Sequence, residues 1–261
     1  RSLNILTDPK LIEDHIFANT LLNIGNILYA KRHEDSMKED YLKRSEFFLK
    51  GAIKIHSKLY GENDLRTLNC LENLAVLYTY INRLDKAESF LTRVLKGRKS
   101  LLGNNHHLLS DTYNNLAVLY GAKGFLKKSE EAQKRSLDIT RKNFGDNHLK
   151  TFKSSSNLAV FYLENNSIEE ASDLFKRNVR SISTIIQKEA PLLSLDNRYL
   201  FFNQFRYEFD IINSSTNKGE LPPEVALLAR LNKHGLLQEI ENRQAKLFNL
   251  NPKSSELLIK L

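Results

Sequence analysis

The 261-residue chain contains a single cysteine, Cys70, and no tryptophan. One cysteine cannot form a disulfide within the chain, and this sparing use predicts a reducing compartment such as the cytoplasm. No apolar run approaches the roughly 18 residues that a membrane-spanning helix requires. The first residues, Arg1–Asn4, do not resemble a signal peptide. We therefore expect a soluble, cytoplasmic protein that has no membrane partner.

The chain also lacks the patterns that mark common catalytic and metal sites. It has no glycine-rich phosphate loop, no Cys-x-x-Cys pair and no His-x-x-x-His pair. Cys70 has no histidine at a motif spacing, so a packed cysteine is the preferred interpretation and a reactive thiol the alternative. His106, His107 and His148 fall at predicted junctions, where they would help to start the next helix. We expect no enzymatic activity, no metal and no cofactor.

The formal net charge of +8 raises the possibility of an anionic partner such as a nucleic acid. Lysine and arginine are nevertheless spread over the chain and interleaved with acids, as in Lys96–Lys99 and Lys127–Arg135. No basic stripe alternates with aromatic residues, as a nucleic-acid groove would require. We therefore expect solvated helix faces and no specific nucleic-acid partner; binding that falls steeply with salt would indicate one.

What the chain does contain is a hexapeptide that begins with Asn-Leu-Ala and recurs at intervals of 42 residues. The copies are Asn73–Tyr78, Asn115–Tyr120 and Asn157–Tyr162. A fixed period of this size is typical of a stack of equivalent repeats rather than one globular core. In such an array we expect the function to lie on the surface that the stack creates, and not in a catalytic pocket.

Each repeat is predicted to consist of two helices separated by a short turn. Apolar residues recur at helical spacing on both sides of Ile81–Arg83, which is the expected turn. Gly103 is placed to end the second helix, because glycine readily adopts the conformation found at helix ends. The same stop recurs at Gly61 and Gly145, in register with the hexapeptide.

Small residues recur at two positions in each repeat, where the paired helices are expected to touch most closely. A larger side chain at either position would hold the helices apart. The tyrosine that ends each hexapeptide is expected to wedge between successive repeats, and a core role is preferred over an active-site role. The small pairs are Ala75 with Ala87, Ala117 with Ser129, and Ala159 with Ala171; the tyrosines are Tyr78, Tyr120 and Tyr162.

A divergent repeat precedes the three clear copies. Asn23–Leu28 fits the hexapeptide, and Ser45–Leu49 fits the start of the second helix, but they lie eight residues farther apart than their later counterparts. The extra residues fall around His33–Tyr41, where they lengthen the turn or extend the following helix. The expected array over residues 1–186 therefore has repeats near residues 11–64, 65–106, 107–148 and 149–186.

These features together resemble the tetratricopeptide repeat family. The period and the Leu-Gly-x-x-His junction at Leu102–His106 are similar to its kinesin-light-chain type. The chain departs from the family pattern at Gly121–Gly124 and at Ser129. The resemblance implies an all-α fold, a right-handed α-solenoid of helix pairs that binds a peptide or protein partner in its concave groove. It does not indicate an oligomeric state.

By that resemblance, the first helix of each repeat lines the concave face, and asparagine is common there. An asparagine amide offers a donor and an acceptor, so it can bind a peptide backbone without selecting a side chain. The alternative, that the repeated asparagines bridge adjacent helices, is equally open. The face is expected to include Asn19, Asn26, Glu72, Val76, Asp111, Val118, Ser156 and Val160. The candidate peptide-binding residues are Asn23, Asn69, Asn73, Asn114, Asn115, Lys153 and Asn157.

Beyond Ile186 the period fails, and residues 187–261 are expected to form a C-terminal helical cap. A dense aromatic helix after a repeat array covers its exposed hydrophobic end. The predicted helices are Asn197–Ile212, which is rich in aromatic residues, Pro223–Asn232 and Leu236–Leu250, with a polar loop at Ser214–Gly219.

Two segments of this region, Arg198–Phe202 and Ala226–Gln238, resemble the helical linker that precedes a CHAT domain, a caspase-like cysteine protease. Asn232 and His234 depart from that pattern. Because the only methionine is Met37 and the chain begins with arginine, we expect a segment of a longer protein. The leading hypothesis is a protein-interaction scaffold, the recognition part of that protein. The alternative is a rigid spacer or inhibitory region of a CHAT-type protease whose catalytic domain lies outside this chain.

Overall fold

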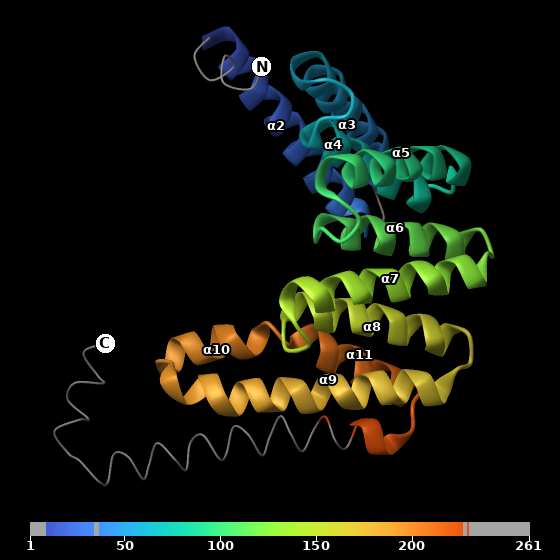
Figure 1. Ribbon diagram of the computed structural model, residues 1–261, viewed down its shortest axis with the longest axis vertical. Coiled ribbons are helices and arrows are strands. Elements are labelled where there is room, and N and C mark those ends of the chain that lie inside the picture. The colour runs from blue at the N-terminus through green and yellow to red at the C-terminus, as the bar shows by residue number, and fades with distance from the viewer. Residues whose placement is uncertain (1–8, 34–36, 227–228, 230–261) are drawn as a thin grey trace, which may run out of the picture. The chain divides into compact units, whose positions relative to one another are not determined.

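A computed structural model describes residues 9–33, 37–226 and 229 (Figure 1). Every regular element in these ranges is a helix and none is a strand, so the expected all-α class is confirmed. The helices follow one another in pairs and then in a C-terminal group. The pairs are α2 (Pro9–Ala30) and α3 (Lys38–Tyr60), α4 (Leu65–Tyr80) and α5 (Leu84–Leu102), α6 (Leu108–Ala122) and α7 (Leu126–Phe144), and α8 (Leu149–Glu164) and α9 (Ile168–Glu189). The 3-10 helix η1 (Lys31–His33) follows α2; η3 (Ala190–Leu192), α10 (Leu195–Asn203) and α11 (Arg206–Asn217) follow α9.

The chain divides into two compact units, residues 1–139 and residues 140–261, with the boundary inside α7. Unit 1 contains α2 to α6 and most of α7, and unit 2 contains the remainder. Each unit is described by itself. The expected boundary between repeat array and cap, at residue 186, stays a prediction.

The predicted helix stops lie where the backbone turns into the left-handed region. Gly61, Gly103 and Gly145 have φ values of +95°, +81° and +81°, which residues with a β-carbon adopt only with strain. Each glycine N–H donates to the carbonyl four residues earlier and so closes the helix before it. Asn82, at φ +59°, turns the chain between α4 and α5 and confirms the predicted turn at Ile81–Arg83.

The paired helices meet at the small residues, and every one of them is buried. Ser45 and Ser129 stand where other repeats have alanine, and their hydroxyls donate to the carbonyl oxygens of Gly25 and Ala117, both at 2.8 Å. Serine is tolerated because the facing backbone comes close enough to accept its proton. At Gly25 a β-carbon would stand 2.9 Å from the Leu49 side chain, so alanine there would force Leu49 to move.

The first two pairs of unit 1 are joined by a tyrosine, as predicted for Tyr78. Tyr78 is buried in α4, and its hydroxyl donates to Glu46 Oε1 of α3 at 2.9 Å. Arg83 and Lys50 bind the same carboxylate at 3.0 and 2.6 Å. Burial alone would raise the pKa of Glu46, but the bonds from Lys50 and Tyr78, with Arg83 nearby, lower it below its ordinary value. The junction therefore combines apolar packing with a stable negative charge.

The insertion in the first repeat both lengthens the turn and extends the helix. Residues 31–37 link α2 to α3, whereas residues 81–83 suffice between α4 and α5. The second helix of the first pair has 23 residues, whereas α5 and α7 have 19 each. Both alternatives left open by the sequence are thus correct.

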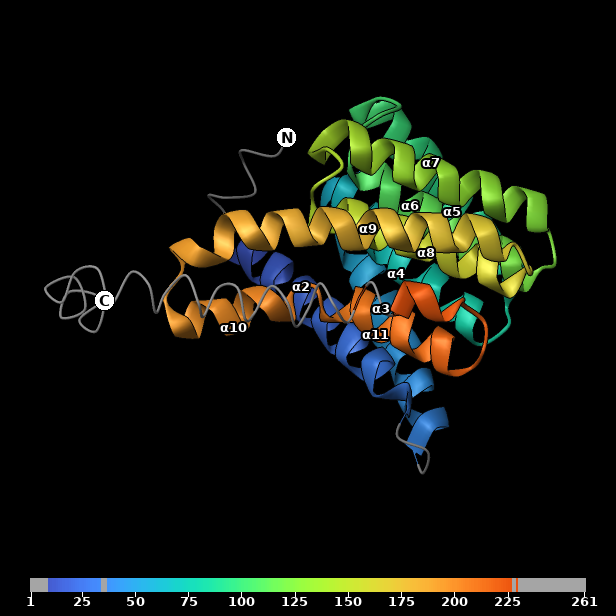
Figure 2. The same cartoon turned by 90° about the horizontal axis from the view of Figure 1, so that it is seen from below.

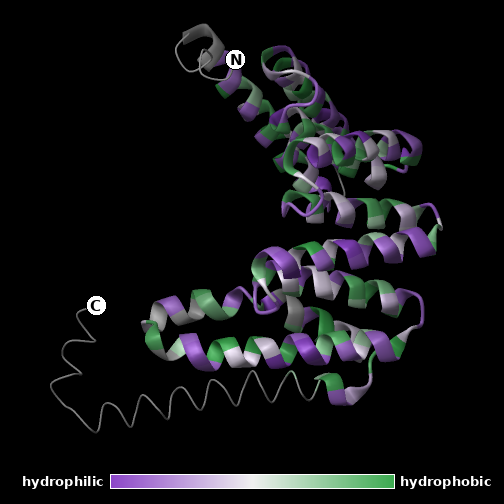
Figure 3. Ribbon diagram, viewed as in Figure 1, coloured by the Kyte–Doolittle hydropathy of each residue, from purple (hydrophilic) through white to green (hydrophobic). Residues whose placement is uncertain are grey.

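In unit 2, α11 lies beside α8 and α9 (Figures 1 and 2). The aromatic residues of the C-terminal group pack against these two helices. Phe205, Phe209 and Ile212 share one hydrophobic core with Phe152 and Phe175. Figure 3 shows hydrophobic and hydrophilic residues alternating along these helices, as expected when only one face of each helix is buried.

Two details of this region are wrong in the sequence prediction. Residues 197–212 do not form one helix, because the N–H groups of Gln204 and Phe205 bond to carbonyls three residues earlier and the chain turns there. Ser214–Asn217 complete α11 instead of forming a loop. The predicted helix 223–232 begins as expected over residues 223–226, and helix 236–250 lies outside the described residues.

The helix contact at Ser129 can be tested by removing its hydroxyl and by enlarging its side chain. We expect Ser129→Ala to lower the free energy of unfolding by about 1 kcal/mol, because one hydrogen bond is lost. Ser129→Val should lower it by about 1–3 kcal/mol, because the facing helix must move. Urea denaturation measures both, and Lys127→Val on the exposed side of α7 controls for the lower helix propensity of valine. Equal effects of the two valine variants would contradict the close contact.

Candidate functional site

The first helices of successive repeats in unit 1, α2, α4 and α6, are neighbours in space. Asn23, Asn73 and Asn115 occupy equivalent positions on them, one to each helix. Asn23 is exposed, and Asn73 and Asn115 are half-buried. Asn69 is exposed one turn before Asn73. We call this row of amides, with its neighbours on the same helix faces, the asparagine face.

The hydrogen bonds of the asparagine face bear on the two roles considered for it. Helix bridging requires each repeated amide to bond to a neighbouring helix. Within the described part of the chain, the Asn73 and Asn115 side chains form no hydrogen bond. Asn114 is half-buried and does have a partner, and so does Asn157 in unit 2. The peptide-binding role of these residues stays a prediction.

Two residues expected on the concave face are buried instead. Glu72 is 6% exposed and pairs with Arg98 at 2.8 Å, because helix α5 covers it. Ser156 is 0% exposed and its hydroxyl accepts a hydrogen bond from Asn178 Nδ2 at 3.1 Å. Both residues directly precede the first asparagine of the hexapeptide, so a step of one residue along the helix separates the packed face from the open one.

Arg98 is the centre of a buried polar network at the junction of two repeats. Its Nη1 donates to Glu72 Oε1 at 2.9 Å, to Thr112 Oγ1 at 2.7 Å and to the Leu108 carbonyl at 3.1 Å. Its Nε is buried and has no partner among the described residues. Burial raises the pKa of Glu72 and outweighs the opposite effect of Arg98. The network joins α4, α5 and α6.

The sequence did not reveal that a histidine lies beside Cys70. His56 Nδ1 on α3 lies 3.7 Å from Cys70 Sγ on α4. The two residues are 14 positions apart in sequence, which is not a motif spacing, so the pair could not be predicted. Both are buried, and burial raises the pKa of the Cys70 thiol to about 12. A thiol in this state is not nucleophilic at neutral pH. The packed interpretation of Cys70 is therefore favoured.

The Cys70–His56 pair and the Arg98 network occupy the same place in consecutive repeats. His56 and Arg98 are one 42-residue period apart, and so are Cys70 and Thr112. The position takes a thiol and an imidazole at one junction and a guanidinium with a hydroxyl at the next. Its recurrence at the same depth identifies it as a structural position of the stack.

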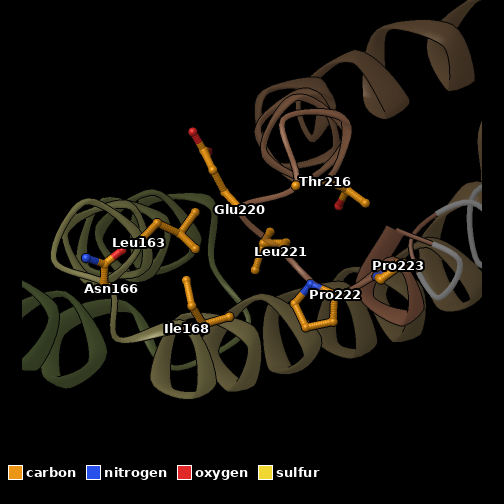
Figure 4. A pocket seen from close by; sticks show the side chains of 9 residues that line it. Leu163, Asn166, Ile168, Thr216, Glu220, Leu221, Pro222 and Pro223 are labelled. Atoms are coloured by element: carbon orange, nitrogen blue, oxygen red, sulfur yellow. The ribbon is translucent and has the colours of Figure 1, made fainter.

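In unit 2, Lys153 is exposed and Asn157 half-buried on α8. A cavity of about 660 Å³ lies between the end of α8 and the loop after α11 (Figure 4). Leu163 and Leu221 supply apolar walls and Glu220 a carboxylate. A second cavity of about 700 Å³ shares Leu163 and Glu220 with the first and extends to Val160. These walls contain no histidine or cysteine.

The described residues form neither a metal site nor a membrane span. Within those residues, no group of three or more histidine, cysteine, aspartate or glutamate side chains is arranged to hold a metal ion. No helix there has the length and apolarity needed to cross a membrane.

Comparison with protein families identifies the repeat. The family model described as "Tetratricopeptide repeat" matches residues 43–100 and 101–180, which is more than half of the chain. A search of curated proteins found no match.

Comparison with solved structures gives the fold. BtubC (BKLC) from P. vanneervenii has a TM-score of 0.55 and 18% identity over 68% of this chain and 66% of that chain. The putative kinesin light chain TPR-like repeats of Podosopora anserina give 0.55 and 17%, over 88% and 97%. A Rap protein complexed with Competence and Sporulation Factor gives 0.54 and 16%, over 88% and 65%. The expected α-solenoid of helix pairs is thus confirmed at the level of fold.

The buried ion pair predicts a strong asymmetry between single and double substitutions. Arg98→Met should lower the free energy of unfolding by about 3–5 kcal/mol, because Glu72 is left as a buried charge without its partner. Adding Glu72→Leu should restore much of this loss. Urea denaturation of the wild type, both single variants and the double variant measures the coupling. Additive effects would contradict the network.

His56 predicts a loss of stability in mild acid. Burial lowers the pKa of His56, and the neighbouring His15 acts in the same direction. In the unfolded chain the His56 imidazole is protonated as the pH falls through about 6.5, whereas in the folded chain it is protonated only at lower pH. The free energy of unfolding therefore decreases as the pH drops below about 6.5. We expect His56→Gln to reduce this slope between about pH 7 and about pH 5 in urea denaturation. His33→Gln at the exposed end of η1 should leave it unchanged.

Proposed function

Because the chain belongs to the tetratricopeptide repeat family, we propose that it is a protein-interaction scaffold whose asparagine face binds an extended peptide segment of a partner. The observation that carries this proposal is the row of equivalent amides on α2, α4 and α6. Asn73 and Asn115 have no partner within the described chain, so both their donors and their acceptors are available.

The spacing of the helices supports an extended ligand. Packed helices lie roughly 10 Å apart, and an extended chain advances about 3.3 Å per residue. A peptide crossing α2, α4 and α6 would therefore present a backbone amide to Asn23, Asn73 and Asn115 at about every third residue. An amide side chain can donate to the peptide carbonyl and accept from the N–H, so the row suits peptides of varied sequence.

The residues around the amides suit a peptide more than a charged polymer. Val76 is half-buried and Val118 is 54% exposed on the same helix faces, and Asp111 is exposed beside them. Small apolar side chains interleaved with amides give contact area without selecting a charge. The Rap protein of similar fold was solved with Competence and Sporulation Factor bound; this supports a binding role for the fold, at an identity that leaves the ligand of this chain open.

The proposal extends to the finer points expected from the sequence. We infer a cytoplasmic, non-catalytic protein, the recognition part of a larger chain. Within unit 2 by itself, we propose Lys153 and Asn157 on α8 as peptide-binding residues. The alternative of a spacer for a CHAT-type protease rests on the linker-like segments 198–202 and 226–238 alone, and most of the second lies outside the described residues. The family comparison supports the repeat and gives no support to that alternative.

A displayed library of random short peptides, selected on residues 1–261, tests the proposal. We expect Asn73→Ala with Asn115→Ala to weaken the selected peptides by about tenfold, since each lost hydrogen bond contributes about 0.5–1.5 kcal/mol. The thermal unfolding midpoint should stay nearly unchanged, because neither amide bonds to the described chain. Asn63→Ala in the turn before α4 serves as the matched control.

Two results would count against this role. A large drop in the unfolding midpoint of the double variant would assign the asparagines to helix bridging. Unchanged affinity of the selected peptides would show that they bind elsewhere.

A further inference from the structure

The two neighbouring cavities of unit 2 share part of their walls and form one larger pocket. The first, of about 660 Å³, and the second, of about 700 Å³, have Leu163, Asn166 and Glu220 in common. Both volumes lie within the range of cavities that hold small organic molecules in proteins. We call the two cavities together the α8–α11 pocket, because the end of α8, α11 and the loop after α11 supply most of its walls.

One end of the α8–α11 pocket is apolar. Figure 4 shows Leu163 and Ile168 facing Leu221 and Pro222 across the first cavity. Leu163 and Leu221 belong to the hydrophobic core of unit 2, so their packing in the core fixes the walls of this end. This end can therefore receive the carbon chain of a ligand.

The other end of the pocket is acidic, although the chain carries a net charge of +8. Glu164 on α8 and Glu220 in the loop after α11 are exposed, and neither forms an ion pair within the described residues. The third carboxylate, Asp210 on α11, pairs with Arg206 at 3.2 Å. Lys218 lines the same end and offsets one charge, so the walls keep a net negative charge. A cleft with walls of one sign concentrates ions of the opposite sign.

A buried hydroxyl without a partner lines the acidic end. Ser215 on α11 is 8% exposed and forms part of the second cavity wall. Within the described part of the chain its Oγ forms no hydrogen bond, whereas the hydroxyl of Thr216 beside it donates to the Ile212 carbonyl at 2.8 Å. Buried hydroxyls in proteins normally have a partner. The Ser215 hydroxyl is therefore available to a ligand that enters the pocket.

These features favour an organic ammonium over a metal ion. Among the residues that the structure describes, no group of acidic, histidine or cysteine side chains is arranged to hold a metal. A primary ammonium carries three N–H donors, which match the oxygens of a carboxylate and a hydroxyl. Glu220 lines both cavities, so its carboxylate lies where the apolar and acidic ends meet. A ligand that joins an ammonium to an apolar chain would use both ends at once.

We propose that the α8–α11 pocket binds a small organic amine. Glu220 and Ser215 bind its protonated nitrogen, Glu164 adds to the negative potential, and Leu163 and Leu221 contact its carbon chain. This inference goes beyond the proposed function, because no amide of α2, α4 or α6 takes part and the ligand is a small cation. Since such a ligand contacts both α8 and α11, it stabilises the packing of the C-terminal helices on the last repeat.

Hexylamine and hexan-1-ol provide the first test, because they share a carbon chain and differ in the polar group. Hexylamine is protonated at neutral pH, as the lysine side chain is. We expect it to bind residues 1–261 about tenfold more tightly than hexan-1-ol, since charge-assisted hydrogen bonds form only with the amine. The difference should shrink as salt rises. Titrations followed by the NMR signals of the Leu163 and Leu221 methyl groups measure both affinities.

Three variants locate the bound nitrogen. Glu220→Gln should weaken hexylamine about tenfold and leave hexan-1-ol unchanged, because only the charge is removed. Ser215→Ala should weaken hexylamine about threefold without lowering the thermal unfolding midpoint, because the hydroxyl has no partner in the described chain. Glu189→Gln, at the exposed end of α9, removes the same charge as Glu220→Gln and should have little effect.

The outcomes keep this proposal separate from the proposed function. Equal affinities for hexylamine and hexan-1-ol, equal effects of Glu220→Gln and Glu189→Gln, or unshifted Leu163 and Leu221 signals would each overturn the amine site. Asn73→Ala with Asn115→Ala should bind hexylamine as the wild type does. If that double variant keeps its affinity for the selected peptides, the proposed function fails and the amine site stands. If peptides bind as proposed but hexylamine does not bind, only the amine site fails.

Discussion

The close contact of two helices at a pair of small residues is the constraint on which the rest of this structure depends. Alanine, glycine or serine at these positions lets the backbones approach until a serine hydroxyl reaches the opposite carbonyl at 2.8 Å. Once the pair is closed, each helix has a fixed rotation about its axis, so every other residue of the repeat has a defined place. Leucines face inward, Tyr78 faces the preceding pair and the asparagines face out.

That rotation also explains why the junctions contain polar groups that carry out no chemistry. The position of His56 and Arg98 points into the seam between repeats, where the next first helix supplies Cys70 or Thr112. A buried polar group must be paired, and the partner comes from a different helix. Such pairs can make one register of the stack more favourable than its neighbours, because a shifted helix would leave the charge of Arg98 without Glu72. The proximity of a thiol and an imidazole is thus a consequence of stacking.

Sequence reasoning succeeded where the signal is periodic and failed where it depends on a partner far away in the chain. The 42-residue recurrence placed Gly61, Ala75 and Tyr78 correctly, because the same residue type recurs at the equivalent position of the other repeats. It did not reveal that Glu72 is buried, since Arg98 covers it from another helix and has a different counterpart in each repeat. The break at Phe205 was missed because the aromatic residues on both sides fit one helical period. In the structure the helix ends there, and Phe205 is buried in the hydrophobic core of unit 2. The peptide-binding role of the asparagines stays a prediction, because the pattern alone does not decide between ligand binding and helix bridging.

The contrast between Glu72 and Asn73 shows how the fold separates a packed helix face from an open one. Adjacent residues on a helix differ by about 100° in direction, so Glu72 enters the junction and Asn73 does not. A carboxylate in the first place requires a buried cation, whereas an amide in the second is satisfied by water. A partner that displaces this water must replace both a donor and an acceptor at each asparagine, and a peptide backbone offers both at every residue other than proline. We therefore expect a surface of amides to favour an extended chain over a partner of one charge.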